Sequence, residues 1–243
     1  MSAGTMSMPT AAEGGQTYGG LRHWNLVVGL IHLIQAGALL ALSNGFTLPV
    51  TRTYLTGPPG PVPAVDDFFG VRLGPAVALF LLLAAIDHLL MAVPGVDGWY
   101  NGMLARKRND ARWIEYSISA SLMIVLIRMI SGVTDLAALV AIAGVTSCMI
   151  FFGLVMERYN RTTGEGVDWL PYVYGCFAGA IPWAIVAFQI ATAEDLGTGG
   201  GVPGFVCGII ISLFLFFNTF AVNMVLQYKQ VGKWRDYLCG EKA

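Results

Sequence analysis

The sequence predicts an all-α integral membrane protein with six transmembrane helices. Three observations support this fold class. The 243 residues are 56% hydrophobic and only 12% charged, with a mean hydropathy of +0.64. Six apolar runs are long enough to cross a bilayer, and the basic residues gather on one side of them. Because a soluble domain carries about 25% charged residues, the composition excludes a soluble globular enzyme, and we expect no enzymatic activity. The net charge of -1 provides no field that would recruit nucleic acid.

Each apolar run supplies roughly the 20 residues that a membrane-spanning helix needs. None of the runs alternates with the period of two that a barrel strand would show. The short link at residues 132–134 predicts a tight antiparallel connection between the third and fourth helices. We expect residues 1–23 to form an N-terminal tail and residues 24–243 a single transmembrane domain, whose helices cover about 24–43, 72–93, 112–130, 135–156, 170–192 and 202–228.

The basic residues predict the orientation in the membrane. Eleven of the 14 Lys and Arg residues fall on the side of the N-terminus, and three fall on the opposite side. By the positive-inside rule both termini are cytoplasmic, and we expect a multi-pass protein of the cell (plasma) membrane. The eleven are Arg22, Arg106, Lys107, Arg108, Arg112, Arg158, Arg161, Lys229, Lys233, Arg235 and Lys242, and the three are Arg52, Arg72 and Arg128.

The outer loop, residues 44–71, is the only long connection. Its Gly-Pro run at residues 57–63 cannot be helical. A loop of this length is either functional or a tolerated linker, and composition alone leaves both possibilities open.

Four ionisable side chains lie inside the predicted spans: His32, Asp87, His88 and Glu115. Such groups are costly in a bilayer and are candidate functional residues. At about 1.5 Å per residue, His32, His88 and Glu115 lie roughly 12, 8 and 5 Å from the cytoplasmic end of their helices. The sequence therefore predicts a buried proton-exchange cluster, although each histidine alone is also compatible with a purely structural hydrogen bond.

Helical spacing indicates which groups share a face. Asn25, His32 and Gln35 fall on one stripe of the first helix, and Glu115 and Ser119 on one stripe of the third.

The remaining charged residues give weaker expectations. Arg112, three residues before Glu115, can pair with it. Asp87 points about 100° away from His88 and is expected to pair with a basic loop residue. Arg112, Arg128 and Glu157 lie near span ends, where long side chains reach the interface. No metal site is expected, because the four cysteines form no CxxC pair and have no histidine nearby.

Two long motifs resemble the heliorhodopsins, a family of microbial-type rhodopsins with inverted topology. They are residues 112–121 (RWIEYSISAS) and 212–221 (SLFLFFNTFA). Residues 53–60 (TYLTGPPG) and 202–205 (VPGF) are also similar. The resemblance extends from about residue 24 to the end of the chain.

The resemblance implies a seven-helix photoreceptor that binds all-trans retinal and is generally dimeric. It acts as a light sensor with a slow photocycle, little or no ion transport and an unidentified signalling partner. Glu115 matches the Schiff-base counterion, and the outer loop matches a segment that forms a β-hairpin and helps dimerisation. His32 and His88, with Arg112 and Ser119, match the proton network, and the retinal pocket comprises Tyr116, Met149, Pro182, Trp183 and Phe217.

One departure from the family pattern concerns the lysine that links retinal in the seventh helix. The four lysines are Lys107, Lys229, Lys233 and Lys242, and none is in mid-membrane. Covalent attachment is therefore not expected within residues 1–243. A truncated chain is the favoured explanation, and a natural or engineered form without the seventh helix is the alternative.

Two other functional classes fit some of the observations. His32 and His88, on adjacent helices at similar depth, are compatible with a bis-histidine haem protein for electron transfer. A small carrier or channel is a further alternative, although the few polar groups form no continuous stripe along a pore.

Overall fold

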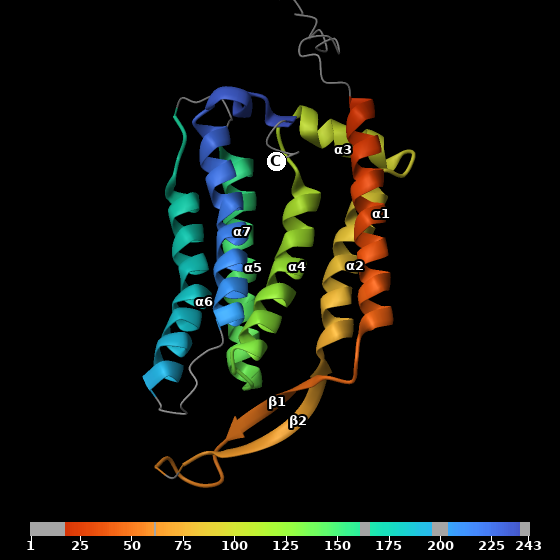
Figure 1. The fold of residues 1–243 in the computed structure, drawn as a ribbon. Coiled ribbons are helices and arrows are strands. Elements are labelled where there is room, and N and C mark those ends of the chain that lie inside the picture. The colour runs from red at the N-terminus through yellow and green to blue at the C-terminus, as the bar shows by residue number, and fades with distance from the viewer. Residues whose placement is uncertain (1–17, 61, 161–165, 196–203, 239–243) are drawn as a thin grey trace, which may run out of the picture.

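The computed structural model describes residues 18–60, 62–160, 166–195 and 204–238, and it consists of a helical bundle with one β-hairpin (Figure 1). Six of its helices are long and apolar enough to cross a membrane, which confirms the six predicted spans. In chain order the elements are α1 (Tyr18–Leu42), β1 (Thr47–Tyr54), β2 (Ala64–Arg72), α2 (Leu73–Met91), α3 (Val96–Ala105), α4 (Asp110–Ile130), α5 (Leu136–Tyr159), α6 (Leu170–Asp195), α7 (Gly204–Tyr228) and a 3-10 turn (Gly232–Arg235).

Helix α3 is the element that the sequence analysis missed. It has ten residues, too few to span a bilayer, and it lies across the end of the bundle (Figure 1). Tyr100, Met103 and Leu104 occupy one face at helical spacing and pack with Leu21 and Met91. The helix therefore closes the end of the α1–α2 pair.

The helices pack mainly with their neighbours in sequence. Helix α1 lies against α2, α2 against α4, α4 against α5, and α5 against α6. Gly29 allows α1 to approach α2 closely, because a Cβ at this position would crowd the side chain of Leu89 and the Cβ of His88. This close approach brings the histidines of the two helices within contact distance.

The outer loop forms an ordered antiparallel hairpin, as the family resemblance implies. Its register runs from Thr47 opposite Arg72 to Tyr54 opposite Ala64, with a bulge after Val50. Val50 is buried in a cluster with Met129 and Leu139. The hairpin is thus packed onto the α4–α5 connection and is not a loose linker.

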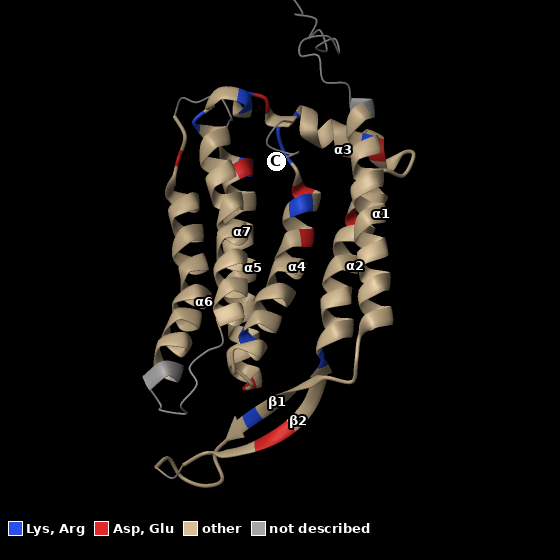
Figure 2. Ribbon diagram, viewed as in Figure 1, with Lys and Arg blue, Asp and Glu red and all other residues tan. Residues whose placement is uncertain are grey.

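Basic residues concentrate at the α3 end of the bundle (Figure 2). This distribution matches the asymmetry on which the predicted orientation rests, and the cytoplasmic placement of that end stays a prediction. Residues 1–17 of the expected tail, Arg161, Lys242 and the start of the sixth predicted span at 202–203 lie outside the described residues.

Candidate functional site: a polar cluster beside an apolar pocket

His32 on α1 and His88 on α2 lie face to face. Their ring centroids are 5.9 Å apart and their planes differ by 14°. The Nδ1 atom of His88 lies 3.1 Å from the amide oxygen of Asn25, and Nδ1 of His32 lies 3.2 Å from that of Gln35. Because an amide oxygen only accepts, the ring N–H of each histidine donates in these contacts. The predicted proximity of the two histidines is confirmed.

Glu115 belongs to the same half of the bundle. Its side chain hydrogen-bonds Ser119, one turn further along α4, as their shared stripe predicts, and it interacts electrostatically with Asp87 of α2. Its Oε1 atom is buried and has no hydrogen-bond partner among the described residues. The expectation that Asp87 pairs with a basic loop residue is wrong, because Asp87 forms no ion pair among the described residues.

The expected pairing of Arg112 with Glu115 is also wrong. Nη2 of Arg112 donates to Oε1 of Glu157 at 2.6 Å. Glu157 is 4% exposed and also accepts hydrogen bonds from Trp113 Nε1 at 2.6 Å and from the Asn109 backbone N–H at 3.0 Å. Tyr237 donates its hydroxyl to the same carboxylate. Four donors therefore satisfy the carboxylate of Glu157. Contrary to the expectation from the sequence, this side chain is buried and does not reach the interface.

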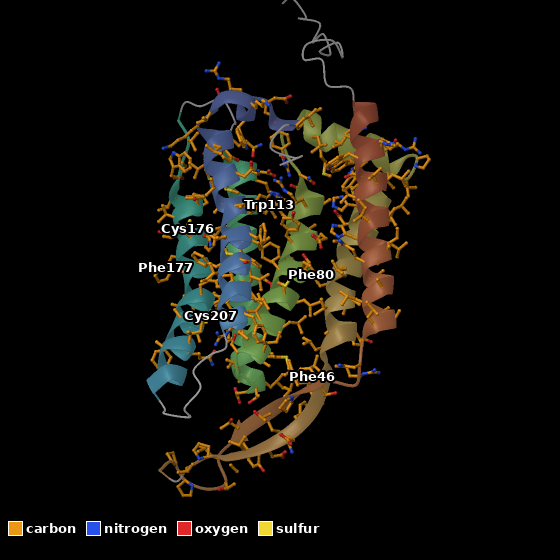
Figure 3. All side chains as sticks on the ribbon, in the orientation of Figure 1. Phe46, Phe80, Trp113, Cys176, Phe177 and Cys207 are labelled. Carbon is orange, nitrogen blue, oxygen red and sulfur yellow. The ribbon has the colours of Figure 1, made fainter. Side chains whose placement is uncertain are left out.

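Trp113 reaches this carboxylate because α5 has a glycine opposite it. A Cβ at Gly153 would overlap the indole ring. Trp113 is 1% exposed, points into the bundle (Figure 3) and packs edge-on against Phe220 of α7. The carboxylate and this aromatic contact together link α4, α5 and α7.

Arg128, at the opposite end of α4, is completely buried instead of reaching the interface. Its Nη2 donates to Gln189 of α6 at 2.5 Å, while Nε and Nη1 have no partner within the described part of the chain. Arg128 is therefore a buried cation whose one hydrogen bond in the described structure goes to the side-chain amide of Gln189.

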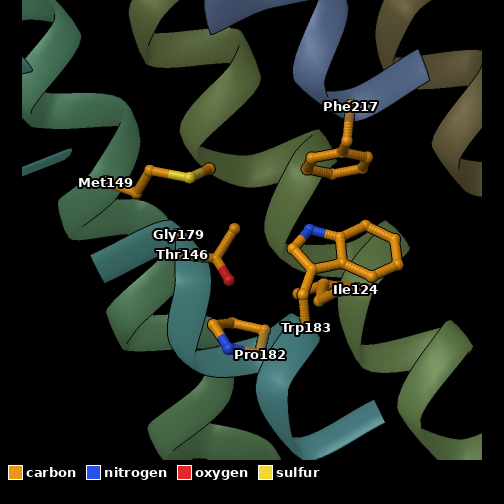
Figure 4. A pocket seen from close by; sticks show the side chains of 7 residues that line it. All are labelled: Ile124, Thr146, Met149, Gly179, Pro182, Trp183 and Phe217. Carbon is orange, nitrogen blue, oxygen red and sulfur yellow. The ribbon is translucent and has the colours of Figure 1, made fainter. Parts of the chain in front are cut away.

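An apolar pocket lies between α4, α5, α6 and α7 (Figure 4). Trp183 and Phe217 meet edge-on with ring centroids 5.8 Å apart. Of the five predicted pocket residues, the structure gathers four around this space. Tyr116 lies elsewhere and packs against Phe220. The lining residues are Ile124, Thr146, Met149, Gly179, Pro182, Trp183 and Phe217.

A family model described as Heliorhodopsin matches residues 21–243. The chain belongs to the heliorhodopsin family. No curated protein matches this heliorhodopsin. Its fold is similar to the crystal structure of a light-driven proton pump, LR (Mac), from Leptosphaeria maculans, with a TM-score of 0.60 and 15% sequence identity over 95% of this chain and 90% of that one.

Family membership implies a retinal-binding rhodopsin with a multi-pass membrane topology, and it favours this interpretation over a haem protein or a carrier. The lining is compatible with a retinal ring in its chemistry, because its only polar side-chain groups are the Thr146 hydroxyl and the Trp183 indole N–H. The space between these side chains is only about 10 Å³, so a side chain would have to move to admit the ring. Gly179 leaves room beside Met149, since a Cβ there would crowd the Met149 sulfur. A flexible methionine can shift to admit a bulky apolar group.

The sequence analysis missed the importance of Glu157 and Arg128. Both lie in the last turn of long apolar helices, where snorkelling is the common outcome. The sequence contains one signal for Glu157, namely Trp113 next to Arg112, because an indole N–H and a guanidinium placed side by side can share a carboxylate. No group of three potential metal-ligating side chains occurs in the described parts of the chain.

Proposed function

We propose that this heliorhodopsin is a light sensor of the plasma membrane that binds all-trans retinal and transports little or no ion. The observation that carries the proposal is the Glu115 carboxyl. Its side chain is partly buried with its Oε1 atom fully covered, and among the described residues no basic side chain forms an ion pair with it. A buried anion without a cation is costly, and retinal held as a protonated Schiff base, the form that the family resemblance implies, would offset that cost. None of the lysines in residues 1–243 lies in mid-membrane to form it. Glu115 is proposed to be the counterion.

Retinal would supply light absorption and a change of shape. The residues of the chain would hold it: Trp183 and Phe217 against the ring, with Met149 and Gly179 setting the width of the pocket. Pro182 lies in the same wall of α6 (Figure 4). Tyr116 packs against Phe220, so it would act at the border of the site and not in its wall.

His32 and His88 are proposed to hold protons that leave the Glu115 region. The two rings lie one against the other, and an imidazole can take up or release a proton near neutral pH. Arg112 would contribute by holding α4 against α5 through Glu157, and Ser119 by orienting Glu115.

The absence of transport is supported by the path toward the hairpin end. Beyond Ser121 and Ser147, whose hydroxyl oxygens are 2.9 Å apart, a buried aliphatic cluster follows. A proton cannot cross such a layer without water or polar side chains. The cluster consists of Ile124, Ile127, Ile142 and Val186.

The hairpin is proposed to contribute to a homodimer in the lipid bilayer. Phe68 and Phe69 of β2 are about half exposed and so present apolar surface on the hairpin. After light absorption, the signal would pass to a partner protein through changes in helix packing.

Retinal binding tests this function. The full chain in lipid nanodiscs is mixed with all-trans retinal, and binding is followed by quenching of tryptophan fluorescence and by visible absorption. We expect Gly179→Val to weaken binding at least tenfold, because its side chain enters the pocket. Gly208→Val is the matched control, since a Cβ at Gly208 meets nothing within 4 Å.

Failure of retinal to bind the wild-type chain, or equal binding by both valine variants, would contradict the pocket assignment. Transport is tested in vesicles that contain the retinal-loaded protein. A sustained light-driven change of internal pH would contradict the sensor assignment.

A further inference from the structure

The wall of the apolar pocket contains two polar side-chain groups with unused hydrogen-bonding capacity. The indole N–H of Trp183 on α6 donates to no other group in the described part of the chain, although an indole N–H inside a protein usually finds an acceptor. The Thr146 hydroxyl on α5 is 2% exposed and donates to the carbonyl oxygen of Ile142 at 2.9 Å. Because this bond uses the only hydroxyl proton, the Thr146 oxygen is left as an acceptor. The wall thus presents one donor and one acceptor.

Both groups border the same small space. Figure 4 shows the indole nitrogen of Trp183 on the edge of the ring that is turned toward Thr146 and Met149. Edge-on contacts with Phe214 and Phe217, at centroid separations of 5.2 and 5.8 Å, hold the indole ring in this orientation. The space measures about 10 Å³, which is close to what one water-sized oxygen needs. The polar part of the wall is therefore matched in size to a single oxygen atom.

The number of groups that a ligand satisfies depends on its chemistry. A retinoid ring without oxygen would cover the indole N–H with hydrocarbon, and a buried donor without a partner costs binding energy. A keto oxygen on the ring accepts from Trp183 but cannot donate to Thr146. A hydroxyl does both, because its oxygen accepts and its proton is donated. The wall therefore favours a hydroxyl over a keto group, and a keto group over an unsubstituted ring.

We propose that the pocket selects a retinoid whose ring carries a hydroxyl group on carbon 3 or 4, with Trp183 donating to the hydroxyl oxygen and Thr146 accepting its proton. This selectivity rests on the proposed function, because it requires that the ring of a retinoid enters this pocket. The flexible side chain of Met149 would move aside for the ring, and the hydroxyl oxygen would take the space between the two polar groups.

Competitive binding tests this selectivity. The full chain in lipid nanodiscs is loaded with tritiated all-trans retinal, which is then displaced by unlabelled retinal, 4-ketoretinal, 4-hydroxyretinal or 3-hydroxyretinal. Affinities are corrected for the partition of each ligand into protein-free nanodiscs. The better of the two hydroxyretinals is expected to bind at least about fivefold more tightly than retinal, the gain typical of one net hydrogen bond. The affinity of 4-ketoretinal should lie between them.

Variants of the two polar residues separate hydrogen bonding from fit, because each comparison is a ratio of affinities for two ligands of the same protein. Trp183→Phe removes the donor and should abolish the advantage of the keto and hydroxyl ligands over retinal. Thr146→Val removes the acceptor and should lower the hydroxyl ligand to the level of the keto ligand. Met149→Leu is the matched control, since it changes an apolar residue of the same wall and should leave the ratios unchanged.

A spectroscopic measurement identifies the group that occupies the space. Ultraviolet resonance Raman spectra report whether an indole N–H is hydrogen-bonded, and the difference between wild type and Trp183→Phe isolates the signal of Trp183. We expect this N–H to be free in the chain alone and hydrogen-bonded after a hydroxyretinal binds. An N–H that is hydrogen-bonded in the chain alone and unchanged by the ligand would assign the site to a bound water and overturn the proposal.

The binding results also distinguish failure of the selectivity from failure of the proposed function. If none of the four retinoids binds, the proposed function fails and the selectivity fails with it. If retinal binds and neither hydroxyretinal binds more tightly, only the selectivity is overturned. It is also overturned if the advantage of the hydroxyl ligand persists in both Trp183→Phe and Thr146→Val.

Discussion

Arg112 donates to Glu157 on α5 at 2.6 Å and forms no ion pair with Glu115, although Glu115 is only three residues away on the same helix. The guanidinium extends toward the end of the bundle, where Trp113 shares the same carboxylate. The ion pair between Arg112 and Glu157 therefore joins α4 to α5, and the Glu115 carboxyl is left without an ion pair among the described residues.

Replacing the carboxylate of this pair should destabilise the bundle. In Glu157→Gln the Arg112 guanidinium, whose side chain is 14% exposed, loses its counter-charge. Removing one partner of a buried ion pair costs about 3 kcal/mol or more. Thermal unfolding in nanodiscs measures the effect. The neighbouring Arg158→Gln removes only an exposed pair with Asp110 and should change stability by less than about 1 kcal/mol; equal losses would refute a special role for Glu157.

A methyl group at Gly153 should separate α4 from α5. Gly153→Ala places a Cβ inside the volume of the Trp113 ring, and overpacking of this kind typically costs about 1–3 kcal/mol. Gly144→Ala on the same helix is the matched control, because its Cβ meets nothing within 4 Å. The melting temperature should fall only for the first variant. The quenching of Trp113 fluorescence should change with it, and a normal melting curve for Gly153→Ala would contradict this packing.

Removing the hydrogen-bond partner of the buried Arg128 should destabilise the protein more than replacing Arg128 itself. Gln189→Leu removes the single hydrogen bond of the guanidinium and should cost roughly 3 kcal/mol. Arg128→Met replaces an incompletely bonded cation by an apolar chain of similar length and should be nearly neutral or stabilising. Urea or thermal unfolding of both variants measures the order, and the reverse order would show that Arg128 is well compensated.

Stability at acid pH should depend on Asp135, which caps α5 just outside its apolar span. Hydrogen bonds from the Ala138 backbone N–H and from Thr53 of the hairpin lower the pKa of this carboxyl. Because the pKa of Asp135 is lower in the folded protein than in the unfolded chain, its carboxylate contributes fully to stability above the unfolded pKa, near 3.9. This contribution is lost as the pH falls through the pKa of the folded state. Melting temperatures measured on acidification should therefore fall more steeply in the wild type than in Asp135→Asn.

The two neutral substitutions at this position separate capping from charge. Asparagine caps a helix about as well as aspartate, whereas Asp135→Ala removes the cap at every pH. Identical acid profiles of wild type and Asp135→Asn would exclude this carboxyl as the titrating group.

The sequence alone determined the membrane class, the six spans and the depth of the polar groups. A bilayer requires long apolar helices, so composition and run length suffice, and a rise of 1.5 Å per residue fixes depth along each helix. The proximity of His32 and His88, the hydrogen bond between Glu115 and Ser119, and the gathering of Met149, Pro182, Trp183 and Phe217 could be anticipated for this reason or from the family motifs.

Only the tertiary structure decided which charged groups meet. Rotation of each helix about its axis and the direction of each long side chain depend on packing across the bundle, which helical periodicity does not specify. The glycine opposite Trp113 brings that ring and Arg112 to Glu157, and the packing of α1 on α2 brings His88 to Asn25 and His32. The sequence placed these residues along their helices, and the contacts between helices selected their partners.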